Sequence, residues 1–238
     1  MDPRKSVNDI RARRDMFAVA HELEQHWGLP IGSLLQVGVS WIGSDANKLT
    51  WTTEGALAAC RDAELGAQLA AAVTRSTGDG LELLATLRQL VGISEASDPR
   101  RDSVDVELYA GIVSGVAVKS PHAVSMLAPD APGLTDLPVP PKAEHAFAVT
   151  DGGTVVALAC NRPSLSVDNH RLHAVGVWTH PDYRRRGMAK AAVSVLVDHL
   201  ALDGDAALWV CDVGNTASLR LAHSVGFVEL WRIFSWGG

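Results

Sequence analysis

The sequence predicts an α/β fold, because strand-like and helix-like segments alternate along most of its 238 residues. A hairpin is predicted over 146–160, where two apolar runs flank the turn Asp151-Gly152-Gly153. Two further apolar runs, 172–179 and 206–211, are each followed by a helix-like segment. Residues before 129 also contain segments of both kinds, which predicts an N-terminal α/β accessory region.

The N-terminal part alternates between predicted helices and strands. The first helix ends where Gly28 and Pro30 break the pattern, and the glycines at 78 and 80 separate the next two helices. In chain order we expect a helix (10–27), a strand (33–42), a turn leading into a strand (45–53), two helices (55–73 and 81–91) and two strands (104–109 and 115–119).

A proline-dense stretch divides the chain. Five prolines lie between positions 129 and 141, and proline neither continues a helix nor donates to a strand ladder. We therefore expect an accessory, acceptor-binding region over 1–128, a linker over 129–142 and a second domain over 143–238.

The second domain has the sharper pattern. Asn215 is a favourable N-cap and Gly226 a favourable C-terminal cap for a short helix between them. The helix predicted over 188–202 is apolar over most of its surface, which predicts that it is well buried. After the hairpin, the expected elements are a strand (172–179), a helix (188–202), a strand (206–211), a helix (216–225) and a strand (228–234).

Composition excludes several classes of function. The net charge of −6 argues against general nucleic-acid binding. The sequence contains no run of about 20 apolar residues, so we expect no membrane span. Cys60, Cys160 and Cys211 lack metal-site spacing, so we expect no metal site and buried free thiols, as in a reducing cytoplasm. The N-terminus lacks the apolar core of a signal peptide.

The segment 179–189 carries the strongest local signal. It joins the end of a strand to the start of a helix, where unpaired backbone N–H groups bind anions. Arg184, Arg185 and Arg186 add positive charge, and Gly187 lets a phosphate approach the backbone closely. The spacing is neither that of a P-loop nor that of a dinucleotide-binding turn. A solvated basic turn is the alternative interpretation.

These residues resemble a known family. Arg184-x-x-Gly187-x-Ala189 after a strand resembles the pyrophosphate-binding loop of the Gcn5-related N-acetyltransferases (GNAT), which hold acetyl-CoA. Asn215 and Gly226 follow in the order of that family's Asn…Gly-Phe signature. The resemblance covers about 143–238 and implies a mixed, mostly antiparallel sheet flanked by helices.

The sequence of the last predicted helix carries a finer resemblance. Leu221-Ala-x-x-x-Gly-Phe, preceded by a Trp-x-Cys-Asp strand, is similar to the subgroup that includes the zwittermicin-resistance acetyltransferase. That resemblance implies an antibiotic as one possible acceptor and thus a role in antibiotic resistance.

The family resemblance implies a set of cofactor contacts. Backbone groups of Val177 and Thr179 would pair with the pantetheine arm, and amides of 185–190 would surround the pyrophosphate. Asn215 and Ser218 would lie near the far end of the arm. The implied acetyl-CoA-binding residues are Val177, Trp178, Thr179, Arg184, Arg185, Arg186, Gly187, Met188, Ala189, Lys190, Asn215 and Ser218.

The catalytic residues are less clearly indicated. Many relatives use a Tyr seven residues after the motif Asn, where this chain has Ala222, so Tyr109, Ser218, His223 or water are the candidates for the proton donor. The strand 172–179 has no carboxylate. His173, whose type titrates near neutral pH, is the first candidate for the base, with a half-exposed strand histidine as the alternative.

Glu144 and His145 are the next candidates for the base, because they immediately precede the hairpin. The predicted catalytic set is His173, Tyr109, Ser218 and Glu144, with no metal ligand.

The resemblance implies an acetyl-CoA-dependent N-acetyltransferase. The expected reaction is direct attack of a small-molecule primary amine, an antibiotic or an amine metabolite, on the acetyl thioester. The acidic net charge favours a cationic acceptor. The alternatives are a protein amine as acceptor, a longer acyl chain, and a CoA-binding regulatory module without turnover. The sequence leaves the oligomeric state open, with a homodimer as one option.

Overall fold

The chain forms two compact units, each assembled from segments that are separated in the sequence. The first unit combines Met1–Asp15, Leu108–Val210 and Ala217–Val228, and the second combines Met16–Glu107, Cys211–Thr216 and Glu229–Gly238. The structure is a computed structural model and describes residues 20–21, 24–25, 30–33, 38–43, 47–51, 55–75, 80–92, 104–110, 121–128, 143–167, 170–212 and 214–236.

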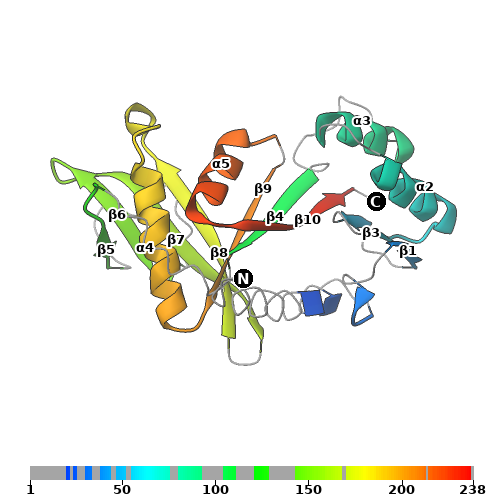
Figure 1. Ribbon diagram of the computed structural model, residues 1–238, viewed down its shortest axis with the longest axis horizontal. Helices are drawn as coiled ribbons and strands as arrows, with labels where there is room; N and C mark the ends of the chain where they lie inside the picture. Colours follow the sequence, from blue (N-terminus) through cyan, green and yellow to red (C-terminus); the bar gives the residue numbers. More distant parts are fainter. Residues whose placement is uncertain are drawn as a thin grey trace, which may run out of the picture. The chain divides into compact units, whose positions relative to one another are not determined.

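The first unit is built on antiparallel strands, with one parallel pair at the end of the series. The order is β9-β8-β7-β6-β5, and only the β8–β9 pair is parallel (Figure 1). Its elements are β5 (Ser125–Leu127), β6 (Ala146–Asp151), β7 (Thr154–Val167), β8 (His170–Thr179), the short 3₁₀ helix η2 (Pro181–Tyr183), α4 (Met188–Leu202), β9 (Ala206–Asp212) and α5 (Thr216–Val225).

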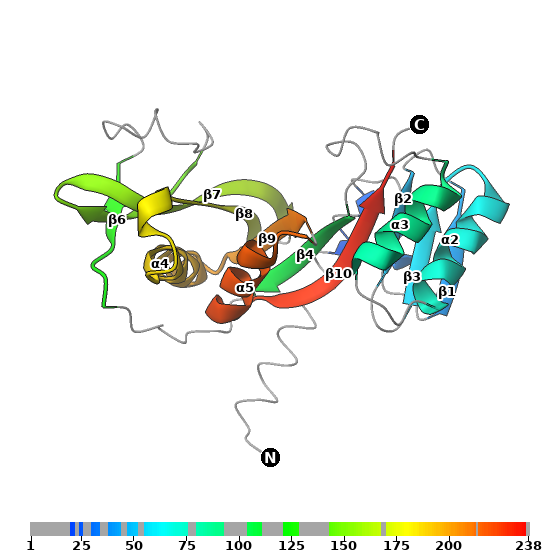
Figure 2. The same cartoon turned by 90° about the horizontal axis from the view of Figure 1, so that it is seen from above.

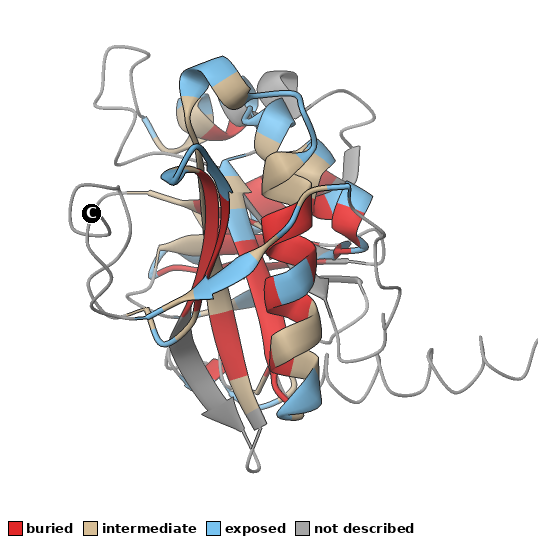
Figure 3. Ribbon diagram, turned by 90° about the vertical axis from the view of Figure 1, so that its left-hand side faces the viewer, coloured by how far each residue is buried: buried red, intermediate tan, exposed pale blue. Residues whose placement is uncertain are grey.

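Helix α4 covers one face of these strands (Figure 2). Its sequence is apolar on most sides, and the residues that pack on β6 and β7 are buried, whereas Leu202 at its end is exposed (Figure 3). Val149, Val156 and Ala157 of the strands form a buried cluster with Ala191 of the helix. The helix is therefore held rigidly with its N-terminus directly after the segment 184–187.

The strands of the second unit are mixed in direction and lie in the order β1-β3-β2-β10. The β1–β3 pair is parallel and the other two pairs are antiparallel. Leu49, Leu69, Leu87 and Phe234 are wholly buried in its core, and α2 packs on the sheet. Its elements are β1 (Gly38–Ile42), β2 (Lys48–Trp51), β3 (Gly55–Ala59), α2 (Ala63–Arg75), α3 (Gly80–Leu90) and β10 (Val228–Ser235). Strand β4 (Val104–Ala110) spans the boundary between the units along the chain.

The α/β class and the mixed, mostly antiparallel strand pairing are confirmed. Every element predicted after residue 143 is present with bounds within two residues, except that β7 continues to Val167 instead of ending at 160. The prediction of one helix over 55–73 is wrong at its start, because Gly55–Ala59 forms the strand β3. Residues 56–59 are buried between β1 and β2, so their pattern is continuously apolar and shows no strand alternation.

The predicted linker 129–142 and strand 115–119 lie outside the described residues. Strands from both sides of the stretch 129–142 pair with one another, β5 with β6 and β10 with β2. The boundaries 1–128 and 143–238 stay a prediction. Within the described part of the chain, no helix is long and apolar enough to cross a membrane.

Candidate active site

Strand β8 loses its partner β9 halfway along its length. The parallel pairing covers only Leu172–Ala174 against Ala206–Leu208, after which the two strands diverge (Figure 1). On its other edge, β8 stays paired with β7 as far as Thr179. The second half of β8 thus has one edge that no described strand of this unit pairs.

The direction of the backbone groups on that edge follows from one hydrogen bond. His180 donates its backbone N–H to the carbonyl of Val156 on β7 across 2.9 Å. Backbone groups alternate in direction along an antiparallel strand, so Thr179 and Val177 direct theirs away from β7. Trp178 faces the other way and its ring packs against Ala146, Ala148, Leu158 and Cys160, which makes it a packing residue.

The segment after β8 forms a concave backbone turn. Arg185 and Gly187 both have left-handed backbone angles, with φ of 62° and 81°. Gly187 is the N-cap of α4 and provides no side-chain hydrogen bond to the helix. The first N–H groups of an α-helix lack intrahelical acceptors, so those of α4 are available to an anion at this turn. No acidic residue lies in the first turn of α4.

Basic and aromatic side chains surround this turn. Arg184, Arg185 and Arg186 are all exposed. The Arg186 guanidinium lies 5.1 Å from the centre of the Tyr183 ring, and the Tyr183 hydroxyl donates to Asp151 across 2.8 Å. That hydrogen bond, together with the negative charge of Asp151, raises the pKa of the Tyr183 hydroxyl. Tyr183 therefore stays neutral and links the turn to the end of β6.

His122 provides a further link from a distant segment. Its Nε2–H donates to the backbone carbonyl of Arg186 across 2.7 Å. A Cβ atom at Gly187 would lie 3.8 Å from the same nitrogen, which is ordinary contact distance. His122 thus fixes the carbonyl just before the helix. Sequence analysis missed it, and no local pattern connects it to position 186.

His173 lies at the centre of a buried polar network rather than on an open surface. Its Nδ1 is 2.7 Å from Asn161 Nδ2, and its Nε2 is 2.8 Å from Asp205 Oδ2. Asn161 Oδ1 accepts the backbone N–H of His145, so the Asn161 amide nitrogen donates to His173. This assigns a neutral imidazole with its proton on Nε2, and both nitrogens are engaged.

The Asp205 carboxylate is charged within this network. Burial acts to raise the pKa of the carboxylate. The hydrogen bonds from His173 and from the backbone N–H of Arg171, together with the positive charge of Arg171, outweigh burial and lower the pKa. The Arg171 guanidinium bridges Asp205 and Glu144, at 3.2 Å and 3.1 Å. Glu144 is exposed. Sequence analysis missed Asn161 and Asp205 as partners of His173.

The remaining predicted residues lie near the end of β9 and in β4. Ser218 Oγ accepts the indole N–H of Trp209 across 3.0 Å, which uses a lone pair of the hydroxyl oxygen and not its hydrogen. Asn215 precedes α5, is exposed, and donates its backbone N–H to the carbonyl of Asp212. Ala222 is fully buried. Tyr109 is part of β4, and its side chain lies outside the described residues.

The three cysteines are free thiols, and Cys60 and Cys160 are buried as predicted. Cys211 is half-buried at the end of β9.

Comparison with known proteins points to one family for part of the chain. Residues 144–231, which is less than half of the chain, match the family model of the GNAT acetyltransferases. The chain is 34% identical over 84 residues to the [ribosomal protein bS18]-alanine N-acetyltransferase of Escherichia coli K12, a match that covers 35% of this chain and 54% of that protein. The chain therefore spans about half the length of the curated relatives it matches.

Two solved structures are also similar. A GNAT-family protein from Novosphingobium aromaticivorans has a TM-score of 0.44 and 21% identity, covering 58% of this chain and 66% of the other. The protein yncA of Salmonella typhimurium, solved with its cofactor acetyl-CoA, has a TM-score of 0.33 and 22% identity, covering 38% of this chain and 61% of the other. The family-model match supports a GNAT acetyltransferase assignment for residues 144–231.

Proposed function

We propose that this chain is an acetyl-CoA-dependent N-acetyltransferase. The observation that carries the proposal is the divergence of β8 from β9 after Ala174, followed directly by the arginine-rich turn and the uncapped N-terminus of α4. The unpaired edge of β8 offers the backbone groups of Val177 and Thr179 to an amide-containing chain. The turn at 184–187 offers N–H groups and positive charge to a pyrophosphate. These two features, in this order, fit the pantetheine arm and pyrophosphate of CoA.

The order of these features fixes the direction of the proposed ligand. With the pyrophosphate at the N-terminus of α4, the arm runs back along β8 from Thr179 towards Val177. The acetyl end then lies where β8 and β9 separate. Bound acetyl-CoA would supply a thioester that a neutral amine attacks directly, so that a C–N bond forms while the C–S bond breaks.

The chain must move two protons in this reaction. The amine loses one to a base, and the departing thiolate gains one from an acid. Ser218 and Tyr109 remain our candidates for the acid, and Glu144 and His173 for the base. His173 has no exposed surface and both its nitrogens are engaged, so we expect it to act by holding Asn161 and Asp205 in place. A water molecule bound to Glu144 is then the simpler acceptor of the amine proton.

For the acceptor we propose a small cationic molecule with a primary amine, because the net charge of −6 attracts cations. A second candidate is the N-terminal amine of a protein. The observation that favours it is the 34% identity over 84 residues to an enzyme that acts on the alanine of a ribosomal protein. The finer resemblance to the zwittermicin-resistance subgroup, and with it a role in antibiotic resistance, stays a prediction.

Release of CoA thiol from acetyl-CoA tests the proposal. The acceptors are a polyamine, an aminoglycoside, an alanine-initiated peptide, and the same peptide already acetylated at its N-terminus as the matched control. We expect amine-dependent thiol release, with product mass increased by one acetyl group. Release with the free peptide but not with the small amines would favour the protein acceptor. Tight binding of acetyl-CoA without turnover on any amine would favour the regulatory module and contradict the enzyme.

A further inference from the structure

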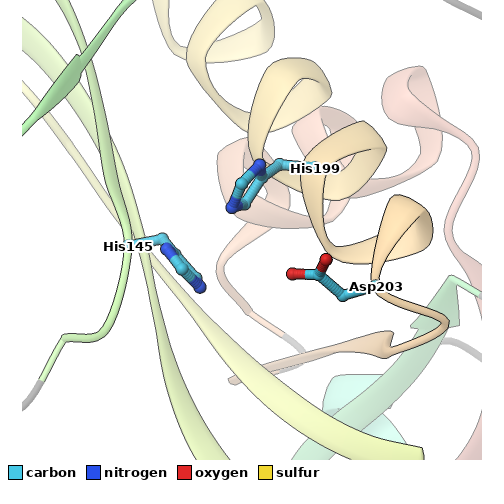
Figure 4. Close-up of side chains that lie close together, drawn as sticks. All are labelled: His145, His199 and Asp203. Atoms are coloured by element: carbon cyan, nitrogen blue, oxygen red, sulfur yellow. The ribbon is translucent and has the colours of Figure 1, made fainter.

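A cluster of two imidazoles and one carboxylate lies at the C-terminal end of α4. His145, His199 and Asp203 each offer a ligand atom, and these atoms lie within 4.8 Å of one another. Figure 4 shows the three side chains turned towards a common point. We propose that this cluster binds one divalent transition-metal ion, Zn²⁺ in the first instance. The cysteine spacing had led us to expect no metal site in this chain.

Two of the three ligands come from one helix face. His199 and Asp203 are four residues apart at the end of α4, and residues at this spacing lie above one another on a helix. Metal sites commonly use this spacing, because it brings two donor groups to one ion without backbone distortion. The helix is packed on β6 and β7, so the pair is held in place.

The third ligand is positioned by the buried network. The backbone N–H of His145 donates to Asn161 Oδ1 across 2.9 Å, and its carbonyl accepts the backbone N–H of Asn161 across 3.2 Å. Asn161 has no exposed surface. The backbone of His145 is thus fixed on both sides, which places its imidazole opposite α4.

An unsatisfied nitrogen points to a ligand at the cluster. His199 Nε2 is inaccessible to solvent and has no hydrogen-bond partner among the residues that the structure describes. The His145 and His199 rings meet edge to face with 4.5 Å between their centres. A buried polar nitrogen left without a partner costs about 1–3 kcal/mol. A metal ion that accepted its lone pair would remove this penalty.

The position of Asp203 also favours a bound cation. Asp203 is the C-cap of α4, where the helix dipole is negative. A carboxylate is unfavourable at this end of a helix, because both are negative. A divalent cation bound to Asp203 would be attracted to the helix C-terminus instead.

Two imidazoles and a carboxylate suit Zn²⁺ and its neighbours, whereas Mg²⁺ and Ca²⁺ prefer oxygen ligands alone. Ligands at Zn–N distances of 2.0–2.1 Å in a tetrahedron lie about 3.3 Å apart. The ligand atoms lie within 4.8 Å of one another, so we expect the side chains to rotate towards the ion when it binds. Twelve residues of α4 separate Gly187 from His199, a rise of about 18 Å. The cluster is therefore distinct from the proposed acetyl-CoA turn, and we infer that its ion ties α4 to the start of β6.

The test is calorimetric titration of Zn²⁺ into the full chain, free of any affinity tag and previously treated with chelator. The variants are His145→Gln and His199→Gln, each confirmed as folded by circular dichroism. His21→Gln is the matched control, because His21 is a histidine of the second unit whose Nε2 contacts the Gln25 amide. Acetyl-CoA affinity is measured for all four proteins as a second readout.

We expect one Zn²⁺ per chain with micromolar or tighter affinity, at least tenfold weaker in both cluster variants and unchanged in His21→Gln. Acetyl-CoA affinity should be the same in all four. Millimolar binding in the unaltered chain, or equal binding by all four proteins, would overturn the proposal. Loss of acetyl-CoA binding in the cluster variants would overturn the separation of the two sites.

Discussion

His173 donates its Nε2–H to Oδ2 of Asp205 across 2.8 Å, and both side chains are buried, with exposed fractions of 0% and 5%. The pair lies where β8 and β9 begin their short parallel pairing, since Leu172 is opposite Ala206. It therefore holds together the start of the pairing, which ends at Ala174 before the two strands diverge. The geometry of the proposed acetyl-CoA site depends on this pair, although neither residue belongs to the turn itself.

The Asp205 carboxylate should make stability depend on pH. Its pKa in the folded chain lies below the ordinary value of about 3.9. A depressed pKa contributes stability that is complete above the unfolded-state pKa and lost as the pH falls through the folded-state pKa. We expect Asp205→Asn to lower the free energy of unfolding by about 1–3 kcal/mol at pH 7. Between pH 5 and pH 3 the variant should lose less stability than the unaltered chain.

Urea denaturation at several pH values measures this difference. Asp182→Asn is a control, because Asp182 is exposed on η2. Parallel curves for Asp205→Asn and the unaltered chain down to pH 3 would show that Asp205 is not the group responsible.

Replacement of His173 should separate structure from catalysis. His173→Gln removes a hydrogen bond to Asn161 or to Asp205, so we expect lower thermal stability. The pH dependence of kcat/KM should stay the same, because His173 is buried and both its ring nitrogens are engaged by Asn161 and Asp205. If His173 is instead the general base, as the sequence suggested, the acidic limb of the profile would disappear in the variant.

His122 should support the turn through the Arg186 carbonyl. His122→Ala removes one hydrogen bond at an exposed position, and we expect about threefold weaker acetyl-CoA binding. His21→Ala, a histidine of the second unit that contacts Gln25, should bind as the unaltered chain does. Unchanged affinity in His122→Ala would mean that the turn keeps its shape without this bond.

The exposed arginines should act through charge. Arg186→Gln should weaken acetyl-CoA binding and reduce its dependence on ionic strength, since exposed charges are screened over about 10 Å at 0.1 M salt. Arg232→Gln is the matched control, because Arg232 is paired with Glu229 on β10. Affinity that falls equally with salt in both variants would argue against a phosphate at Arg186.

The second half of the chain was predictable because its signals are local. Gly187 precedes one helix, Gly226 follows another, and the turn at 151–153 indicates a hairpin. The apolar sequence of α4 predicts that the helix is buried. The turn at 184–187 could likewise be named from its arginines and its place after a strand. These features depend on residues that are close together in the sequence.

The features that sequence analysis missed depend on distant residues. The strand β3 is specified by its neighbours β1 and β2, while its own sequence, Gly-Ala-Leu-Ala-Ala, favours a helix as much as a strand. The network of Asn161, His173 and Asp205 joins β7, β8 and the residue before β9, which only the fold brings together. Nothing near His173 in the sequence indicates that both its nitrogens are engaged.

The most direct test of the account is calorimetric titration of acetyl-CoA into the unaltered chain and into Gly187→Glu. Gly187 and Gly92 both have positive φ angles and tolerable space for a Cβ, so Gly92→Glu in the second unit controls for backbone strain. We predict micromolar binding that Gly187→Glu abolishes and Gly92→Glu retains, with both variants folded. Equal affinity in Gly187→Glu, or no binding by the unaltered chain, would contradict the assignment of the turn at 184–187 as the acetyl-CoA site.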